Sequence, residues 1–184
     1  MMKKEAFNQL KNMKNSVILA TVQAKNYQKT NINIIKYLTK DMGIPGVYVT
    51  LNKPYTAIKN ILKETKVDTR LILFIDAITK TVGGKTKKTK ECLFIGTPEN
   101  LSDISLAMDQ AVTSLPGHEK FLFFDSLNTL LLYNEVRTVA RFIHFLAGKM
   151  RTWKVKGIIV SLQKKGNEDL INELTQFCDI QLEL

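Results

Sequence analysis

Continuous apolar runs alternate with helical periods along the chain from residue 16 onward. The runs SVILATV and KGIIVSL show no polar alternation, which is typical of strands buried on both faces of a parallel sheet. Strands are expected at 16–22, 46–51, 70–79, 92–96, 120–127, 156–162 and 180–184. Helices are expected at 30–41, at 54–64, from Thr97-Pro98 to Leu115, at 135–153 and before the last strand. The pattern predicts an α/β fold with a doubly wound, mainly parallel sheet and helices on both faces.

Residues 1–184 are expected to form a single domain, since no internal repeat, low-complexity tract or boundary interrupts the alternation. Two segments stand outside the pattern. Residues 1–15 are a polar N-terminal lead-in, and residues 80–91 are rich in lysine and glycine and lack an apolar period. We expect this second segment to be an exposed loop.

The net charge changes the picture of possible partners. Lys and Arg number 27 against 17 Asp and Glu, which gives a formal charge of +10. Such a field favours anionic partners, but a lysine-rich surface that serves solubility has the same composition, and both interpretations stay open. No apolar run reaches the roughly 18–20 residues that a membrane span needs, so no membrane association is expected. The polar stretch 5–15 argues against a signal peptide, and we expect a cytoplasmic protein.

The first strand–loop–helix unit is the place where a phosphate-binding P-loop would lie. A P-loop needs the pattern G-x-x-x-x-G-K-[ST], because glycines let backbone N–H groups wrap the phosphates. The corresponding segment, QAKNYQKT (23–30), keeps Lys29 and Thr30 but has Gln23 and Gln28 at the two glycine positions. Lys-Thr at a helix start is also common in helices that bind nothing, so this interpretation stays open.

Five segments appear in an order similar to that of KaiC-like proteins in the RecA superfamily of P-loop ATPases, archaeal ones especially. They are SVILATV, GVYVTL, LILFIDAIT, FLFFDSLNTLL and GKMRTWKVKGIIVSL, and the resemblance covers most of residues 16–184. It implies a RecA-like fold in which FFDSL is the Walker B strand. Asp125 would then be the carboxylate associated with Mg²⁺, with Ser126 beside it.

The departures from the family pattern concern hydrolysis. Active members end the second strand with two acidic residues that activate water, whereas Asn52 and Lys53 stand there in this chain. Asn accepts no proton near neutral pH, and Lys carries the opposite charge. The family's G-G-I-P-x-G signature before the first strand is also absent.

We therefore predict a degenerate Walker A motif and a domain that does not hydrolyse ATP. It would act as a binding or regulatory module, through an unknown protein partner or self-association. The alternative is an ATPase with an atypical P-loop, which would bind ATP and Mg²⁺ through a vestigial site of Lys29, Thr30, Asp125 and Ser126.

A third hypothesis is nucleic-acid binding through basic residues on the long helix and in the lysine-rich loop. The residues concerned are Arg137, Arg141, Arg151, Lys85, Lys87 and Lys88. A basic stripe of this kind can follow a phosphate backbone, but the solvated face of an amphipathic helix has the same pattern. No residue cluster predicts a bound metal ion outside the vestigial nucleotide site.

Overall fold

A seven-stranded parallel sheet forms the centre of the molecule in the computed structural model, which describes residues 4–87, 89–163 and 168–184. The spatial order of the strands is β4-β3-β2-β5-β6-β1-β7. Their bounds are β1 Val17–Val22, β2 Gly46–Thr50, β3 Ile72–Asp76, β4 Cys92–Phe94, β5 Phe121–Asp125, β6 Lys156–Leu162 and β7 Ile180–Glu183. All pairings between them are parallel, as the continuous apolar runs predict.

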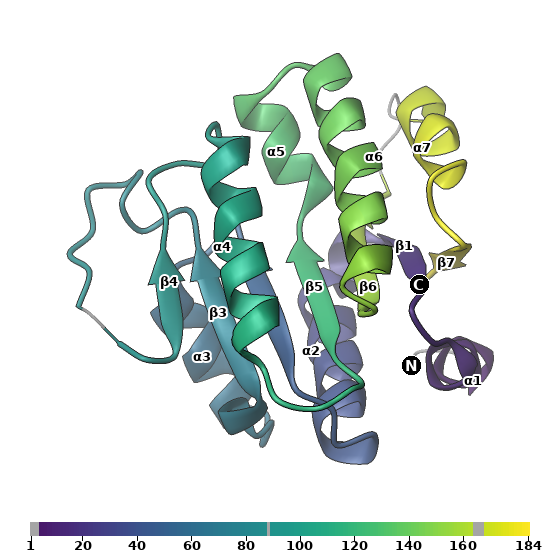
Figure 1. Ribbon diagram of the computed structural model, residues 1–184, viewed down its shortest axis with the longest axis horizontal. Helices are drawn as coiled ribbons and strands as arrows, with labels where there is room; N and C mark the ends of the chain where they lie inside the picture. The colour runs from purple at the N-terminus through teal and green to yellow at the C-terminus, as the bar shows by residue number, and fades with distance from the viewer. Residues whose placement is uncertain (1–3, 88, 164–167) are drawn as a thin grey trace.

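Helices cover both faces of this sheet (Figure 1). One face carries α1 Lys4–Asn12, α2 Tyr27–Lys36 with a π-helical last turn Tyr37–Asp41, and α3 Tyr55–Glu64. The other carries α4 Leu101–Ser114, α5 Leu127–Tyr133, α6 Val136–Thr152 and α7 Glu168–Thr175. Two short 3-10 turns, Ala24–Asn26 and Thr69–Leu71, precede α2 and β3. The predicted doubly wound α/β fold is therefore confirmed.

Alternate residues of each strand pack into two separate hydrophobic cores. In β1, Val17 and Leu19 face α6, while Ile18 and Ala20 face α2. Successive side chains of one strand therefore point alternately into the two hydrophobic cores. This explains why these strands have no polar face. The middle residues of the strands are apolar and packed in these cores. The buried polar residues Thr50, Asp76 and Asp125 are the last residues of their strands.

Several predicted boundaries are wrong. The N-cap of α4 is Asn100, whose side chain accepts a hydrogen bond from the Asp103 backbone N at 3.1 Å, and not Thr97. The strand expected over 120–127 ends at Asp125 and is followed by α5, which the sequence pattern did not reveal. The N-terminal lead-in contains α1. The segment 80–87 is exposed and follows β3 as a loop.

Gly46, the first residue of β2, is a sensitive packing position. A Cβ atom at this position would lie only 2.3–2.4 Å from three atoms of the Phe121 ring, and that side chain is fully buried. We expect Gly46→Ala to lower the free energy of unfolding by about 1–3 kcal/mol through overpacking. Gly148, which is exposed on α6 and has open space at its Cβ, is the matched control. Gly148→Ala should raise stability by up to about 1 kcal/mol through helix propensity, as urea unfolding would measure.

Candidate functional site

The candidate site lies at the carboxyl ends of the strands, around the last residue of β5. Asp125 pairs in register with Thr50 at the end of β2, and its side chain is only 2% exposed. The helix that follows β2 lies on one face of the sheet, and the helices that follow β5 lie on the other. Ligands of doubly wound sheets bind in the crevice at such a switch point.

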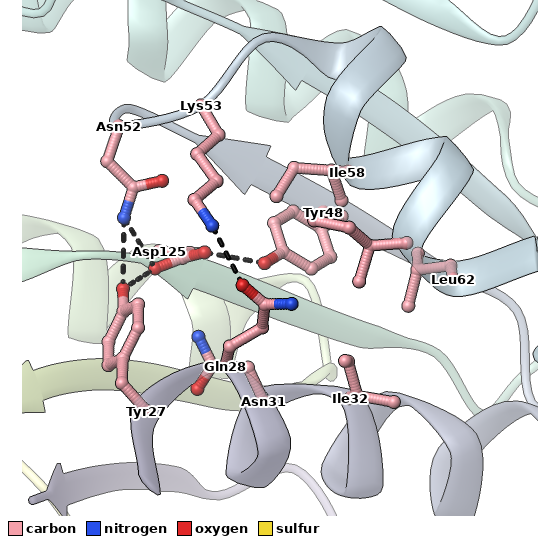
Figure 2. Close-up of a pocket in the computed structure, with 11 residues that line it drawn as sticks. Tyr27, Gln28, Asn31, Ile32, Tyr48, Asn52, Lys53, Ile58, Leu62 and Asp125 are labelled. Atoms are coloured by element: carbon pink, nitrogen blue, oxygen red, sulfur yellow. Dashed lines mark hydrogen bonds between the residues drawn. The ribbon is translucent and has the colours of Figure 1, made fainter. Parts of the chain in front are cut away.

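Two tyrosines and an asparagine from three different elements hold the Asp125 carboxyl group (Figure 2). The Tyr27 hydroxyl, from the first residue of α2, donates to Oδ1. The Tyr48 hydroxyl, from β2, donates to Oδ2 at 2.5 Å. The Asn52 amide, just after β2, donates to Tyr27 at 3.2 Å and to Oδ1 of Asp125 at 3.4 Å. Both carboxyl oxygens are therefore occupied by side chains of this chain.

Burial determines the charge of this group. Desolvation raises the pKa of Asp125 to about 8. It also raises the pKa of Tyr48 above its ordinary value, against a smaller effect of the Asn31 side chain. No Lys or Arg within the described residues forms an ion pair with Asp125. The carboxyl group accordingly keeps its proton through most of the neutral range.

A second contact lies beside this cluster and joins the loop after β2 to α2. The Lys53 ammonium donates to Oε1 of Gln28 at 2.9 Å (Figure 2). The space left between α2 and α3 is a cavity of about 30 Å³, lined by the residues above together with Asn31, Ile32, Ile58, Ile61 and Leu62. Pockets that bind small ligands measure about 300–1,000 Å³, so this cavity holds no nucleotide in the conformation described.

The segment 23–30 is a turn and not a wrapped loop. Gln23 is extended, Ala24–Asn26 form a 3-10 turn, and α2 begins at Tyr27, two residues before Lys29. No residue of the segment has a positive φ. A backbone nest that encloses a phosphate needs residues of alternating handedness, and this segment provides none.

The residues predicted for a nucleotide site are only partly brought together. Lys29 is exposed and contacts neither Asp125 nor Ser126 among the described residues, whereas Thr30 is buried in α2. Ser126 is buried, and its hydroxyl lies 3.3 Å from that of Thr129. Tyr27 lies within the segment 23–30 that the sequence singles out, whereas the sequence analysis did not identify Tyr48. The only signal for Tyr48 is its position two residues before the end of β2, and it becomes useful only once β2 and β5 are known to be neighbours.

The predicted nucleic-acid residues do not form one surface. Arg137 and Arg141 are exposed on α6, but Arg151 donates to Asp179 and to the Phe177 carbonyl, each at 2.9 Å. Lys85 and Lys87 lie in the loop beside β4, at the opposite edge of the sheet from β7, while α6 packs on β6 and β1 (Figure 1). Lys88 lies outside the described residues.

Other kinds of site are scarce in the part of the chain that the structure describes. No group of three His, Cys, Asp or Glu residues there is arranged to hold a metal ion. Cys92 and Cys178 are free thiols, and burial raises the pKa of Cys178 to about 11. No helix within these residues has the length and apolar character to cross a membrane.

Residues 47–184 match the family described as "Family of unknown function (DUF7504)". The chain belongs to this family. The DUF7504 match begins within β2, so it contains Tyr48, Asn52 and Asp125 but not Tyr27. A search of curated proteins finds no significant match.

Solved structures resemble this DUF7504 chain in fold. The KaiC-like protein PH0186 from the hyperthermophilic archaea Pyrococcus horikoshii OT3 superposes with a TM-score of 0.67 at 15% sequence identity, over 93% of this chain and 74% of that chain. A second protein of the same organism, described as a structural study of Project ID PH0250, gives a TM-score of 0.66 at 14% identity. This likeness covers 99% of this chain and 87% of that chain. The fold is accordingly that of a KaiC-like, RecA-type domain.

The raised pKa of Asp125 predicts an unusual dependence of stability on pH. The folded protein holds a proton up to about pH 8 that the unfolded chain releases at about pH 4. Stability from this group is therefore complete below about pH 4 and is lost as pH rises toward 8, with a slope of at most about 1.4 kcal/mol per pH unit. Urea unfolding between about pH 5 and 8 should show this slope for the wild type and a flatter profile for Asp125→Asn. Parallel profiles for the two proteins would contradict the assignment.

Proposed function

We propose that this chain is a KaiC-like domain that does not hydrolyse ATP and acts as a binding or regulatory module for a protein partner. The observation that carries the proposal is the hydrogen bond from Tyr27 to Asp125. A Walker B carboxylate must be ionised and open to Mg²⁺, as the resemblance to KaiC-like ATPases implies. In this chain the carboxyl group is buried, is held by two hydroxyl groups and has a pKa raised to about 8.

The positions that would activate the attacking water support the same proposal. Asn52 donates its amide to Tyr27 and Asp125, and Lys53 donates its ammonium to Gln28. Neither side chain can take a proton from water at neutral pH. We interpret the segment 23–30 as a degenerate Walker A motif, because it has neither glycines nor a residue of positive φ.

ATP binding would require a rearrangement with a defined cost. Tyr27 would have to leave Asp125, and breaking hydrogen bonds to a buried group costs about 1–3 kcal/mol. The turn 24–26 would also have to unwind from its 3-10 form. This cost lowers affinity by roughly 5- to 160-fold relative to a preformed loop.

The alternative, an ATPase with an atypical P-loop, has one observation in its favour. Lys29 is exposed in the first turn of α2 and has no hydrogen bond or ion pair with the described residues. A helix N-terminus with a free lysine attracts anions. We therefore design the test to separate weak anion binding from hydrolysis.

Phosphate release and thermal unfolding in millimolar Mg-ATP test the proposal together. We expect release at the background rate for the wild type and for Asp125→Asn alike, because neither Asn52 nor Lys53 can take a proton from the water. We also expect no Mg-dependent rise in Tm. Binding would be easy to detect, because a ligand that binds only the folded state and is present at 100 times its Kd adds about 2.7 kcal/mol to the stability. A small rise that sodium pyrophosphate reproduces without Mg²⁺ and that Lys29→Ala removes would indicate anion binding alone.

One result would overturn the proposal in favour of the ATPase. It is turnover well above background in the wild type that Asp125→Asn abolishes and that Tyr27→Phe leaves intact or increases. Tyr27→Phe removes only the hydroxyl group and keeps the ring, so it serves as the conservative control for the role of this hydrogen bond.

A further inference from the structure

A groove between α4 and α6 lies on the face of the sheet opposite the Asp125 cavity. Its volume is about 690 Å³, and residues of both helices line it. Both helices precede parallel strands, so they run in the same direction over one face of the sheet (Figure 1). Asp109 of α4 closes one end, where its carboxylate accepts hydrogen bonds from Lys149 and from the Trp153 indole, each at 2.9 Å. The rest of the groove is open to solvent.

Large apolar side chains are exposed at this groove. Leu106 of α4 is 59% exposed and Phe145 of α6 is 49% exposed, and both line it, with buried Phe142 beneath. Hydrophobic surface of this kind, rimmed by polar residues such as Ser102 and Thr138, is typical of interaction sites.

The charge of the groove indicates which partner it fits. Lys149 neutralises Asp109, the one acidic residue of the lining, and the paired ammonium lowers the pKa of that carboxyl group. Arg141 is exposed and makes no hydrogen bond or ion pair with the described residues. The groove therefore presents an uncompensated cation beside apolar anchors, on a chain of formal charge +10.

The dimensions favour a helix as the occupant. The lining of α4 runs from Leu101 to Asp109, which is about 12 Å or two turns at 1.5 Å per residue. A peptide that binds as an added β-strand needs a free sheet edge for its backbone hydrogen bonds, and two parallel helices offer none. A helix satisfies its own backbone and inserts side chains at i, i+3 or i+4, and i+7.

A second copy of this chain is a poor occupant. Two copies of charge +10 repel each other. The acidic helix α7 carries Glu168 and Asp169 in its first turn, but its apolar residues Leu170 and Leu174 are buried in its own core.

We propose that the α4–α6 groove binds an acidic amphipathic helix of a partner protein. This inference rests on the proposed role as a binding module and gives the partner its chemical class. The apolar face of the partner helix packs on Leu106 and Phe145, and its carboxylates pair with Arg141.

Selection from a random library of peptides of about four helical turns, displayed against the full-length chain, tests this inference. We expect enriched peptides with apolar residues at helical spacing and Asp or Glu beside them. In fluorescence polarisation, Phe145→Ser and Arg141→Glu should each weaken their binding by about tenfold or more. Lys40→Glu makes the same change in net charge on the opposite face of the sheet and should alter binding by less than about twofold.

Four outcomes would overturn the inference: no enrichment, enrichment of basic or extended peptides, affinities that the groove variants leave unchanged, or a dimer in sedimentation that Phe145→Ser abolishes. Both substituted side chains are exposed, so the variants should keep their Tm. Leu106→Ser, from the other wall, repeats the test if one of them does not fold. Phosphate release measured on the same proteins separates this inference from the proposed function. ATP turnover would refute only the proposed absence of hydrolysis. A failed peptide selection would refute only the proposed groove.

Discussion

A carboxyl group buried at the end of β5 imposes the main constraint on the carboxyl edge of this sheet. A buried carboxylate without partners costs several kcal/mol, so Asp125 needs hydrogen-bond donors or must keep its proton. Hydroxyl groups from α2 and β2 contact both of its oxygens, and desolvation raises its pKa to about 8. The packing of α2, β2 and β5 at this edge thus depends on the Asp125 carboxyl group. The same side chains that stabilise it also occupy both oxygens of the carboxyl group.

Much of the architecture could be predicted from the sequence. The continuous apolar runs SVILATV and FLFFDSL identify strands buried on both faces, and the helical periods between them imply the doubly wound sheet. Helix α5 escaped prediction because Leu127–Tyr133 is only seven residues long, too short for a helical period to stand out beside the apolar run of β5. The start of α4 was placed at the wrong polar residue, since Thr97 and Asn100 are both acceptable caps by residue type.

The site was harder to predict than the fold. The sequence shows that the segment 23–30 contains no glycine, but it does not show that Ala24–Asn26 form a 3-10 turn. The contact between Tyr48 and Asp125 joins residues 77 positions apart, and it exists because β2 lies beside β5 in one particular register. Strand order and register are set by the whole sheet, so periodicity along the chain cannot supply them. The separation of the basic residues between α6 and the β4 edge has the same origin.

Carboxyl ¹³C NMR of Asp125, assigned by comparison with Asp125→Asn, tests the central claim most directly. We expect this resonance to titrate near pH 8 and to stay unchanged when millimolar Mg-ATP is added, because Tyr27 and Tyr48 already occupy both oxygens. Titration near the ordinary value of about 4, together with a shift on addition of Mg-ATP that EDTA reverses, would contradict a closed site.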